Sequence, residues 1–356
     1  MPTYTHGGDL LTAQTQYGGP ILDFSANLNP LGMPESVRHA AAAAVEEAIH
    51  YPDPLCRALR AGIAAQSGVA EEQVICGNGA ADVLFRLVQA KAPRRALVTA
   101  PTFSEYEQAL RSVGCRVKYH YLKPEQRFDV TETILKGITP SLDMVFLCTP
   151  NNPTGRIIAP SLLAQILRRC EALDILLAVD ECFLALSDQG DTPGLAPYLK
   201  ESRHLFLLRA FTKSYAIPGL RLGCGLSGDG DLLERMSAVG QPWPVSGPAQ
   251  AAGIACLQET DWPNQARKLI QTERAWLLEQ LRTRHLTVWE GQANYLLFQA
   301  PGRTDLKARL LEQGILIRSC ANYVGLGEDY YRAAVRPREE NERLIQALDA
   351  VLGGKS

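Results

Sequence analysis

The sequence predicts an α/β protein with a mostly parallel sheet and helices on both faces. Short apolar runs at 95–99, 144–148, 175–179 and 204–208 alternate with segments of helical periodicity such as 160–172. Strands buried on both faces are continuous apolar runs, whereas covering helices repeat about every 3.6 residues. This alternation indicates a layered fold in which ligands bind outside the carboxyl ends of the strands.

Length and composition indicate a globular chain with one large core and a smaller second unit. The chain has 356 residues, 46% of them hydrophobic and 21% charged, and its formal net charge is −2. A nearly neutral chain gives no reason to expect a nucleic-acid partner. The longest apolar runs, such as 40–45, are too short for a membrane span, and the N-terminus lacks a secretion-signal pattern. We therefore expect a cytoplasmic protein.

The cysteines are scattered singly, without a Cys-x-x-Cys pair or a histidine at metal-ligand spacing. In a reducing compartment this pattern predicts free thiols in the core, with no disulfide and no metal site. The nine residues are Cys56, Cys76, Cys115, Cys148, Cys170, Cys182, Cys224, Cys256 and Cys320.

The first 27 residues are polar and weakly periodic, which predicts an arm rather than a helix. Asn27 and Asn29 at its end either build turns or bind a polar substrate. A helix is expected over 34–49. The prolines that follow Tyr51 then force the next segment to be extended.

The segment Cys76–Asp82 opens an amphipathic helix with small residues. Its free N–H groups and the positive end of the helix dipole suit a phosphate. The glycine spacing matches neither Walker A nor the dinucleotide fingerprint, so a simple turn is the alternative. Phe103, after the strand at 95–99, is either a core residue or a platform for a bound ring.

Polar groups follow three successive strands of the predicted sheet. Asn151–Gly155 comes after the first, Asp180 and Glu181 come after the next, and Lys213 comes after the third. Because the carboxyl ends of parallel strands meet at one edge of the sheet, these side chains are expected to lie together. Their coincidence favours a functional site over ordinary turns.

Lys213 stands on a turn among small and hydroxyl-bearing residues. Loss of water and a neighbouring cation, expected to be Arg221, both disfavour its ammonium form, so the amine can act as a nucleophile near neutral pH. That is the chemistry of a Schiff-base lysine. A surface lysine that keeps its charge in water is the alternative.

Asp180 ends an apolar run, and a carboxylate there needs a cationic or N–H partner. The protonated ring nitrogen of pyridoxal phosphate is such a partner. This cofactor needs a lysine, a carboxylate at its ring nitrogen, a donor to its 3-oxygen and a cup for its phosphate. The residues available are Lys213, Asp180, Asn152 and the Gly79–Ala81 helix start with Arg221. An ordinary α/β core with Asn-Pro turns is the alternative.

Six motifs occur in order between residues 23 and 338. They are Tyr-Pro-Asp-Pro at 51–54, Pro-Thr-Phe at 101–103, Pro-Asn-Asn-Pro-Thr-Gly at 150–155, Asp180-Glu181, Thr212-Lys213 and Gly-Leu-Arg-Leu-Gly at 219–223. As a set they resemble the fold-type-I pyridoxal-phosphate enzymes of the aspartate aminotransferase superfamily. The resemblance implies a large domain with a mostly parallel sheet and a smaller C-terminal α/β domain.

The resemblance also implies a role for each matching residue. Lys213 would bind the cofactor covalently, Asp180 would pair with its ring nitrogen, and Asn152 would bind its 3-oxygen. Phe103 would stack on the ring, with Tyr106 nearby. The phosphate would be held by Ala80, Ala81, Thr212 and Arg221, together with Tyr51 of a neighbouring subunit, which implies a homodimer.

Two positions depart from the superfamily pattern. Phe183 stands where many members have a tyrosine, so the ring 3-oxygen should lose one donor. Ala210 stands where a serine or threonine often contacts the phosphate, a loss that Thr212 could offset.

After Gly223 the sequence predicts a smaller α/β unit. Its expected helices are 248–258 and 262–284, and its expected strands are 287–290, 295–299, 315–318 and 331–335. The expected organisation is an N-terminal arm at 1–30 packing near the active site, a large cofactor-binding domain at 31–245 and a small domain at 246–356.

Arginines are the polar exceptions in this smaller unit. Arg318, Arg332 and Arg336 lie at the ends of apolar strands. A buried guanidinium must be paired, and its planar fork suits a carboxylate or a phosphate. Salt bridges to nearby glutamates are the alternative.

The segments His6-Gly7-Gly8, 24–32, 211–223 and 317–323 narrow the resemblance to the threonine-phosphate decarboxylases of cobalamin biosynthesis. The implied substrate is L-threonine O-3-phosphate and the product is (R)-1-aminopropan-2-yl phosphate. The implied substrate-binding residues are His6, Gly7, Asn27, Asn152, Arg318 and Arg332.

Two other hypotheses remain open. Histidinol-phosphate aminotransferases are the nearest relatives with a different reaction, and the reaction type rests on the resemblance because the sequence does not show which substrate bond lies perpendicular to the ring. A regulatory protein of this fold is the third hypothesis. Such proteins usually carry a DNA-binding extension, which the sequence does not show.

Overall fold

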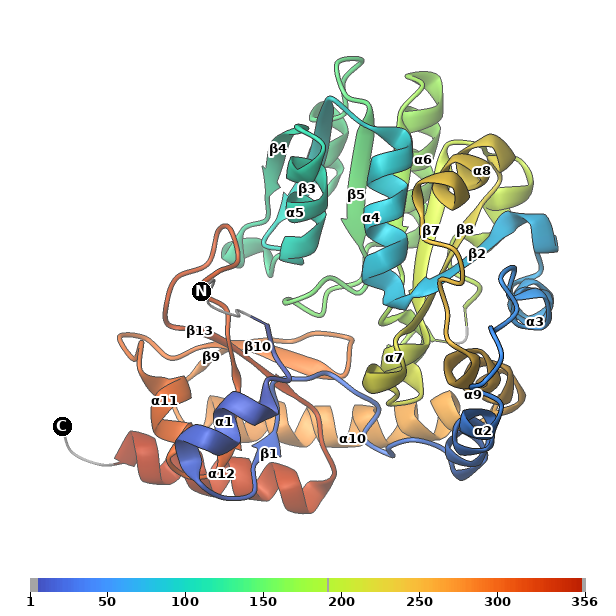
Figure 1. The fold of residues 1–356 in the computed structure, drawn as a ribbon. Coiled ribbons are helices and arrows are strands. Elements are labelled where there is room, and N and C mark those ends of the chain that lie inside the picture. The colour runs from blue at the N-terminus through green and yellow to red at the C-terminus, as the bar shows by residue number, and fades with distance from the viewer. Residues whose placement is uncertain (1–5, 191, 354–356) are drawn as a thin grey trace.

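A computed structural model describes residues 6–190 and 192–353. It contains a seven-stranded sheet, at the top of Figure 1, and a four-stranded sheet below it. The seven-stranded sheet has the order β2-β8-β7-β6-β5-β3-β4. Its strands are β2 (Val74–Asn78), β3 (Arg95–Ala100), β4 (Arg116–Tyr121), β5 (Met144–Cys148), β6 (Leu176–Asp180), β7 (Leu205–Ala210) and β8 (Leu222–Ser227).

The five strands β4, β3, β5, β6 and β7 run parallel, and β8 runs antiparallel to both of its neighbours. Alternate residues of each strand face opposite sides, so that Leu97 joins the core beneath α6 (Pro160–Ala172) and Val98 joins the core beneath α4 and α5. Helices α4 (Gly79–Lys91) and α5 (Ser104–Ser112) cover this second face. The predicted α/β fold class is confirmed.

The four-stranded sheet is antiparallel throughout, in the order β12-β13-β10-β9. Its strands are β9 (Thr287–Trp289), β10 (Tyr295–Gln299), β12 (Arg318–Ser319) and β13 (Tyr330–Ala334). Helices α10 (Trp262–Arg282), α11 (Leu306–Leu311) and α12 (Arg338–Gly353) accompany it. Their apolar side chains form one core with the sheet.

The strand expected at 315–318 is divided between two sheets. Ile315 and Leu316 form β11, which pairs in parallel with β1 (Leu22–Asp23), whereas Arg318 begins β12. The N-terminal segment therefore packs on the smaller unit. A backbone pairing between segments so far apart leaves no local signal in the sequence.

The prediction that the first 27 residues contain no helix is wrong at α1 (Leu10–Tyr17). The Asp9 side chain accepts from Thr12 N–H at the start of this helix, and Gly18 ends it in a left-handed conformation with φ 79°. Ala13 is its one buried residue. The caps at Asp9 and Gly18, rather than an apolar stripe, stabilise this helix, so its sequence lacks the hydrophobic periodicity on which the prediction relied.

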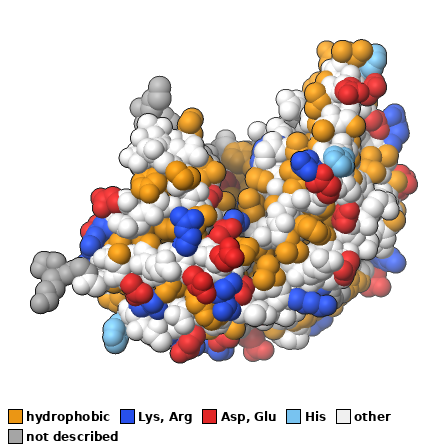
Figure 2. Space-filling model, turned by 90° about the horizontal axis from the view of Figure 1, so that it is seen from below, with side chains coloured by type: hydrophobic (Ala, Val, Ile, Leu, Met, Phe, Trp, Pro, Cys, Tyr) orange, Lys and Arg blue, Asp and Glu red, His pale blue; other side chains and the backbone are white. Residues whose placement is uncertain are grey.

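Helices α2 (Glu35–Glu46), α3 (Arg57–Ser67) and α9 (Gly247–Gln258) form the right-hand side of the molecule in Figure 1. Several large apolar side chains on or near them are exposed, and in the view from below hydrophobic side chains reach the tip of the lobe at the right (Figure 2). These exposed residues are Val45, Ile49, Tyr51, Leu55, Trp243 and Ile254.

The nine cysteines are all buried and free. Within residues 6–190 and 192–353 there is no helix long and apolar enough to cross a membrane.

Candidate active site

The three polar groups predicted at strand ends do come together at one edge of the seven-stranded sheet. Asn152 follows β5, Asp180 is the last residue of β6, and Lys213 lies on the short helix α7 (Phe211–Ser214) after β7. Since β5, β6 and β7 are parallel neighbours, their carboxyl ends lie side by side. The fold therefore brings a lysine, a carboxylate and an amide to one place.

Asp180 is buried and held by two donors. Its Oδ2 accepts from the Tyr106 hydroxyl at 2.5 Å, and its Oδ1 accepts from the backbone N–H of Cys182 at 2.8 Å. Burial raises the pKa of the Asp180 carboxyl, and the two donors oppose that rise. A cation placed beside this carboxylate would favour its ionised form. The resemblance predicted that Tyr106 lies near the cofactor ring, but it did not predict the hydrogen bond from Tyr106 to Asp180.

Lys213 is partly buried, with Nζ 5.7 Å from the centre of the Phe183 ring. Burial, followed by repulsion from Arg332 and then from Arg221, lowers the pKa of Lys213 to about 8, although Cys182 and Asp180 act in the opposite direction. Arg221 therefore lowers the pKa of Lys213 as expected, but Arg332 lowers it more. Near neutral pH a usable fraction of this amine is unprotonated.

The start of α4 forms a small cradle beside Arg221. Gly79 has φ +83°, and a Cβ there would lie 2.3 Å from Arg221 Nη2. A Cβ at Gly223 would lie 2.3 Å from the backbone nitrogen of Ala80. Both glycines are thus required for the close approach of Arg221 and β8 to the exposed helix start. Free N–H groups and a guanidinium are the groups that bind a phosphate.

Other residues predicted for cofactor binding come from α4, from α7 and from the residue before α5. Ala81 is partly buried in the first turn of α4. The Thr212 hydroxyl donates to Leu222 O at 3.4 Å, and Ala210, which precedes α7, brings no hydroxyl. Phe103 is partly exposed, with its ring edge-to-face against Tyr106 at 5.6 Å.

Tyr51 lies on the outer surface of this chain. Its side chain is exposed and its ring stacks on Trp243 at 4.3 Å. Within one chain it has no part in the site described above.

Arg318 and Arg332 are directly opposite each other on the antiparallel strands β12 and β13. Both are buried, and in the described part of the chain neither forms an ion pair with a carboxylate. Arg336 differs, because its Nε lies 2.7 Å from Glu340 Oε2. The salt-bridge alternative therefore holds for Arg336, whereas the other two arginines form a buried cationic pair, called here the arginine pair.

Arg332 reaches across to the larger sheet. Its Nη1 donates to Asn152 Oδ1 at 2.5 Å and its Nη2 donates to Ser25 O at 2.7 Å. The guanidinium lies 5.3 Å from the centre of the Tyr295 ring. With its amide oxygen turned toward the guanidinium, Asn27 accepts from Nε and Nη1 of Arg332, both at 3.2 Å. Neutral acceptors hold Arg332 without cancelling its charge.

Arg318 has fewer partners. Its Nη2 donates to Asn322 Oδ1 at 2.7 Å, and its guanidinium lies 5.5 Å from the centre of the Tyr323 ring. The hydroxyl of Tyr323 donates to Asn152 Oδ1 at 3.1 Å. Asn152 is therefore connected to both members of the arginine pair.

The segment around His6 lies against α5. His6 Nε2 is 2.8 Å from Glu105 Oε1, and the two rings of His6 and Phe103 have centroids 6.4 Å apart. A Cβ at Gly7 would lie 2.3 Å from Ser25 O, and Gly8 N–H donates to Ser25 Oγ at 2.8 Å. Only a residue without a side chain at position 7 permits this packing.

Sequence reasoning missed Ser25, Glu105, Tyr295 and Tyr323. Glu105 is buried and its Oε2 has no partner within the described residues, yet a glutamate in the first turn of a helix is ordinary in sequence. Tyr323 ends the segment 317–323, but the sequence gives it no role. A single tyrosine after a short strand has no pattern that predicts its contacts.

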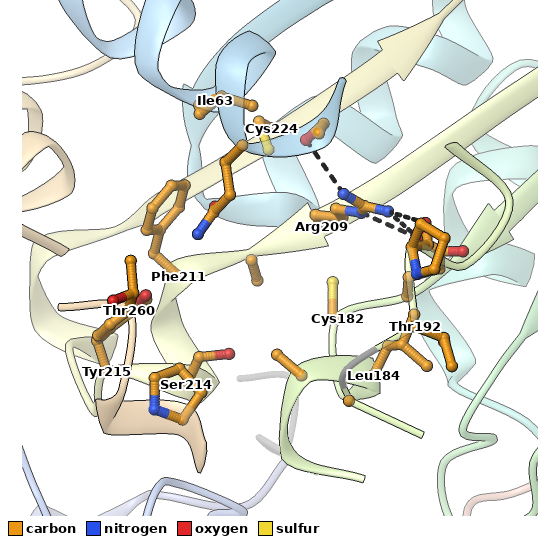
Figure 3. Close-up of a pocket in the computed structure, with 18 of the residues that line it drawn as sticks. Ile63, Cys182, Leu184, Thr192, Arg209, Phe211, Ser214, Tyr215, Cys224 and Thr260 are labelled. Carbon is orange, nitrogen blue, oxygen red and sulfur yellow. Dashed lines mark hydrogen bonds and ion pairs between the residues drawn. The ribbon is translucent and has the colours of Figure 1, made fainter. Parts of the chain in front are cut away.

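A cavity of about 410 Å³, drawn in Figure 3, is lined in part by residues of α7. Ser214 and Tyr215 line it, whereas Lys213 and Asp180 do not. Figure 3 shows Arg209 with dashed lines to its partners, and its guanidinium donates to Glu181, Ser67 and Pro193. Because Arg209 is held by these groups, the cavity is a poor candidate for the chemistry.

Comparisons with known proteins point to one family. Residues 19–348 match the family described as aminotransferase class I and II. A threonine-phosphate decarboxylase of Salmonella typhimurium is 41% identical, over 98% of this chain and 97% of that protein.

Two solved structures have the same fold. A histidinol-phosphate aminotransferase from Clostridium acetobutylicum superposes with a TM-score of 0.87 at 27% identity, covering 94% of this chain and 99% of that one. The enzyme of the same description from Sinorhizobium meliloti, solved with pyridoxal-5′-phosphate, gives 0.86 at 20% identity, covering 99% and 95%. The full-length match and the lysine, carboxylate and amide at three adjacent strand ends lead to one conclusion, that the chain belongs to the class I and II aminotransferase family.

Proposed function

We propose that this protein is a pyridoxal-phosphate enzyme that decarboxylates L-threonine O-3-phosphate to (R)-1-aminopropan-2-yl phosphate in cobalamin biosynthesis. The observation that carries the proposal is the arginine pair, two buried guanidinium groups without a described carboxylate partner beside a lysine with a lowered pKa. Such a pair calls for a ligand with two anionic groups, and phosphothreonine has a carboxylate and a phosphate. The identity to the Salmonella threonine-phosphate decarboxylase supports the same substrate.

The residues present fit pyridoxal phosphate. Lys213 would bind it covalently, Asp180 would pair with its ring nitrogen, Asn152 would donate to its 3-oxygen, and Phe103 would lie on its ring. Ala80, Ala81, Thr212 and Arg221 would hold its phosphate at the start of α4. When bound, the cofactor withdraws electrons from the bond that breaks at the substrate Cα.

Asp180 is suited to this task because its pKa is raised by burial while nothing cationic faces it among its hydrogen-bond donors. A protonated ring nitrogen would supply the missing charge. The hydroxyl of Tyr106 fixes Oδ2 and the N–H of Cys182 fixes Oδ1, so the carboxylate cannot rotate away.

The substrate is held from the other sheet. We assign Arg332 to the substrate carboxylate, and Arg318 with His6 and Asn27 to the side of its phosphate, with Gly7 and Asn152 as further substrate-binding residues. Two separate anchors set the torsion about the Cα bonds, and a decarboxylase must hold its carboxylate out of the plane of the ring. Lys213, with a pKa of about 8, can deliver a proton to Cα after carbon dioxide leaves.

The proposal includes a homodimer in the cytoplasm. Exposed apolar side chains occur on or near α2, α3 and α9, and the exposed Tyr51 stacks on one of them, Trp243. In a dimer Tyr51 would contact the cofactor phosphate of the neighbouring subunit. The proposed organisation remains an arm at 1–30, a large domain at 31–245 and a small domain at 246–356.

The test is incubation of the purified holoenzyme with O-phospho-L-threonine, with carbon dioxide release followed in the presence and absence of 2-oxoglutarate. Release that does not need the oxo acid supports the decarboxylase. A reaction that requires 2-oxoglutarate and accepts histidinol phosphate would instead identify an aminotransferase, the activity named for the Clostridium structure.

A further inference from the structure

We infer that Tyr323 positions both halves of the active site, its hydroxyl by fixing the amide of Asn152 and its ring by supporting Arg318. This inference rests on the proposed function and adds a specificity-determining residue to it. Tyr323 lies in the turn after β12 and is buried. It touches one group that belongs to the cofactor side of the site and one that belongs to the substrate side.

The hydroxyl acts on Asn152. Oδ1 of this amide accepts from Tyr323 at 3.1 Å and from Arg332 Nη1 at 2.5 Å. An amide carries its oxygen and its nitrogen on opposite sides, so two donors on the oxygen fix Nδ2 on the side away from them. Nδ2 is then left to donate to the cofactor 3-oxygen, the role that the proposed function gives it. Without the hydroxyl, Arg332 alone holds the amide, and Arg332 is also required by the substrate.

The ring acts on Arg318. The guanidinium lies 5.5 Å from the centre of the Tyr323 ring, within the range of an attractive cation–π contact. Arg332 has the same arrangement with Tyr295 at 5.3 Å. Two like charges directly opposite on neighbouring strands repel, and each is therefore supported by its own aromatic ring. This support keeps Arg318 in place before an anion arrives.

Tyr323 also sets the distance between the two anion sites. Its ring is in contact with Arg318 and its hydroxyl bonds to the amide that Arg332 holds, so a single rigid side chain spans the pair. A substrate whose two anions match this span is favoured over one with a different spacing. Tyr323 is thus a positioning residue rather than a catalytic one.

Two substitutions separate the hydroxyl from the ring. Tyr323→Phe removes the hydroxyl and keeps the ring, whereas Tyr323→Leu removes both. Tyr331→Phe is the matched control, because Tyr331 is a buried tyrosine of the adjacent strand β13 whose hydroxyl donates to Arg303 O at 2.7 Å, in the core of the smaller unit. Thermal denaturation of all three variants measures any general loss of stability.

For Tyr323→Phe we expect the dissociation constant of pyridoxal phosphate, measured by titrating the apoprotein, to rise by about 2- to 12-fold, the effect of one lost hydrogen bond. KM for phosphothreonine should stay within about 2-fold, because the ring still supports Arg318. In an Asn152→Ala background the same change should have no further effect on cofactor affinity, because its partner is gone.

For Tyr323→Leu we expect the same loss of cofactor affinity, and in addition a rise in KM for phosphothreonine of about 2- to 30-fold, with less effect on unphosphorylated threonine. The role of the hydroxyl would be overturned if Tyr323→Phe bound pyridoxal phosphate as tightly as wild type and Tyr331→Phe do. An unchanged KM in Tyr323→Leu would overturn the role of the ring. If wild type releases no carbon dioxide from phosphothreonine, the proposed function fails, while the cofactor titration still decides the role of the hydroxyl.

Discussion

The two sides of the active site differ in how their charges are balanced. On the side of the seven-stranded sheet, Asp180 has donors on both oxygens and Asn152 has donors on its oxygen. On the side of the four-stranded sheet, the arginine pair is buried with neutral acceptors and aromatic rings. The first side is fixed by the protein itself. The arginine pair on the second side has no carboxylate partner among the described residues, which is why we propose that the smaller sheet recognises an anionic substrate.

The largest effect is expected at Lys213. Replacement by alanine removes the amine that we propose binds the cofactor and moves the proton, so turnover of phosphothreonine should be abolished. The fold, measured by circular dichroism, and noncovalent cofactor binding should persist because the cradle around Arg221 is unchanged. Lys200→Ala, at an exposed lysine, is the control. Turnover close to that of wild type in Lys213→Ala would rule out this assignment.

Asp180→Asn tests the cofactor side of the comparison. The substitution keeps the shape and removes the negative charge that a protonated ring nitrogen requires. We expect kcat to fall by at least ~10²-fold, the size of effect seen when one electrostatic stabiliser is removed. Cofactor content, measured by absorbance after gel filtration, should remain near one per chain. An unchanged kcat with full cofactor content would mean that Asp180 is a structural carboxylate.

Arg318→Ala and Arg332→Ala test the substrate side. Each should weaken phosphothreonine binding by about 2 to 4 kcal/mol, because each removes a charge-assisted pair from a desolvated site. The Arg318 variant should lose most of the preference for phosphothreonine over threonine. The Arg332 variant should keep that preference but lose control of the Cα torsion, so abortive transamination should rise relative to decarboxylation.

Arg336→Ala is the control for both, since Arg336 is paired with Glu340. Both arginine variants could keep the fold, the preference for phosphothreonine over threonine and the ratio of transamination to decarboxylation seen in wild type. That result would mean that the arginine pair has a purely structural role.

The difference between the two sides also explains what the sequence could predict. Asp180 ends its strand, and Lys213 and Asn152 follow theirs by a few residues, so a local pattern and the rule for parallel sheets were sufficient to bring them together. The sequence identified Arg318 and Arg332 as candidate binding residues. It could not predict that they lie opposite each other, because β12 is two residues long and the expected strand 315–318 is split between two sheets. Glu105 and Tyr323 act through contacts between distant segments, which leave no periodic signal.

A second substitution at Lys213 tests how its lowered pKa affects the stability of the apoprotein, and its expected effect is smaller. Its pKa is lowered from 10.5 to about 8 in the folded state, so the unfolded chain binds more protons between these values and stability rises with pH across that window. At pH 7 the penalty is fully present. Lys213→Met should therefore stabilise the apoprotein at pH 7 by about 3 kcal/mol, from 1.36 kcal/mol per pKa unit. Urea unfolding at pH 7 and above pH 10.5 measures it.

The gain should shrink as pH rises and vanish above about pH 10.5, where the amine is neutral in both states. A gain that is equal at both pH values would come from better packing of the methionine and not from removal of a buried charge.

The smallest effect is expected at Glu105, which ties the segment around His6 to the cofactor side through a contact of 2.8 Å between His6 Nε2 and Glu105 Oε1. Glu105→Ala removes this anchor, and KM for phosphothreonine should rise by about 2- to 12-fold with kcat nearly unchanged, the effect of one hydrogen bond on binding. Glu105→Gln keeps an oxygen that accepts from His6 and should restore most of the affinity. Glu107→Gln is the matched control, because Glu107 lies on the same helix and pairs with Arg111. Hydrogen exchange at residues 6–9 should increase in Glu105→Ala but not in Glu107→Gln. If KM and exchange in Glu105→Ala match those of the control, His6 is held by other contacts and Glu105 has no part in substrate binding.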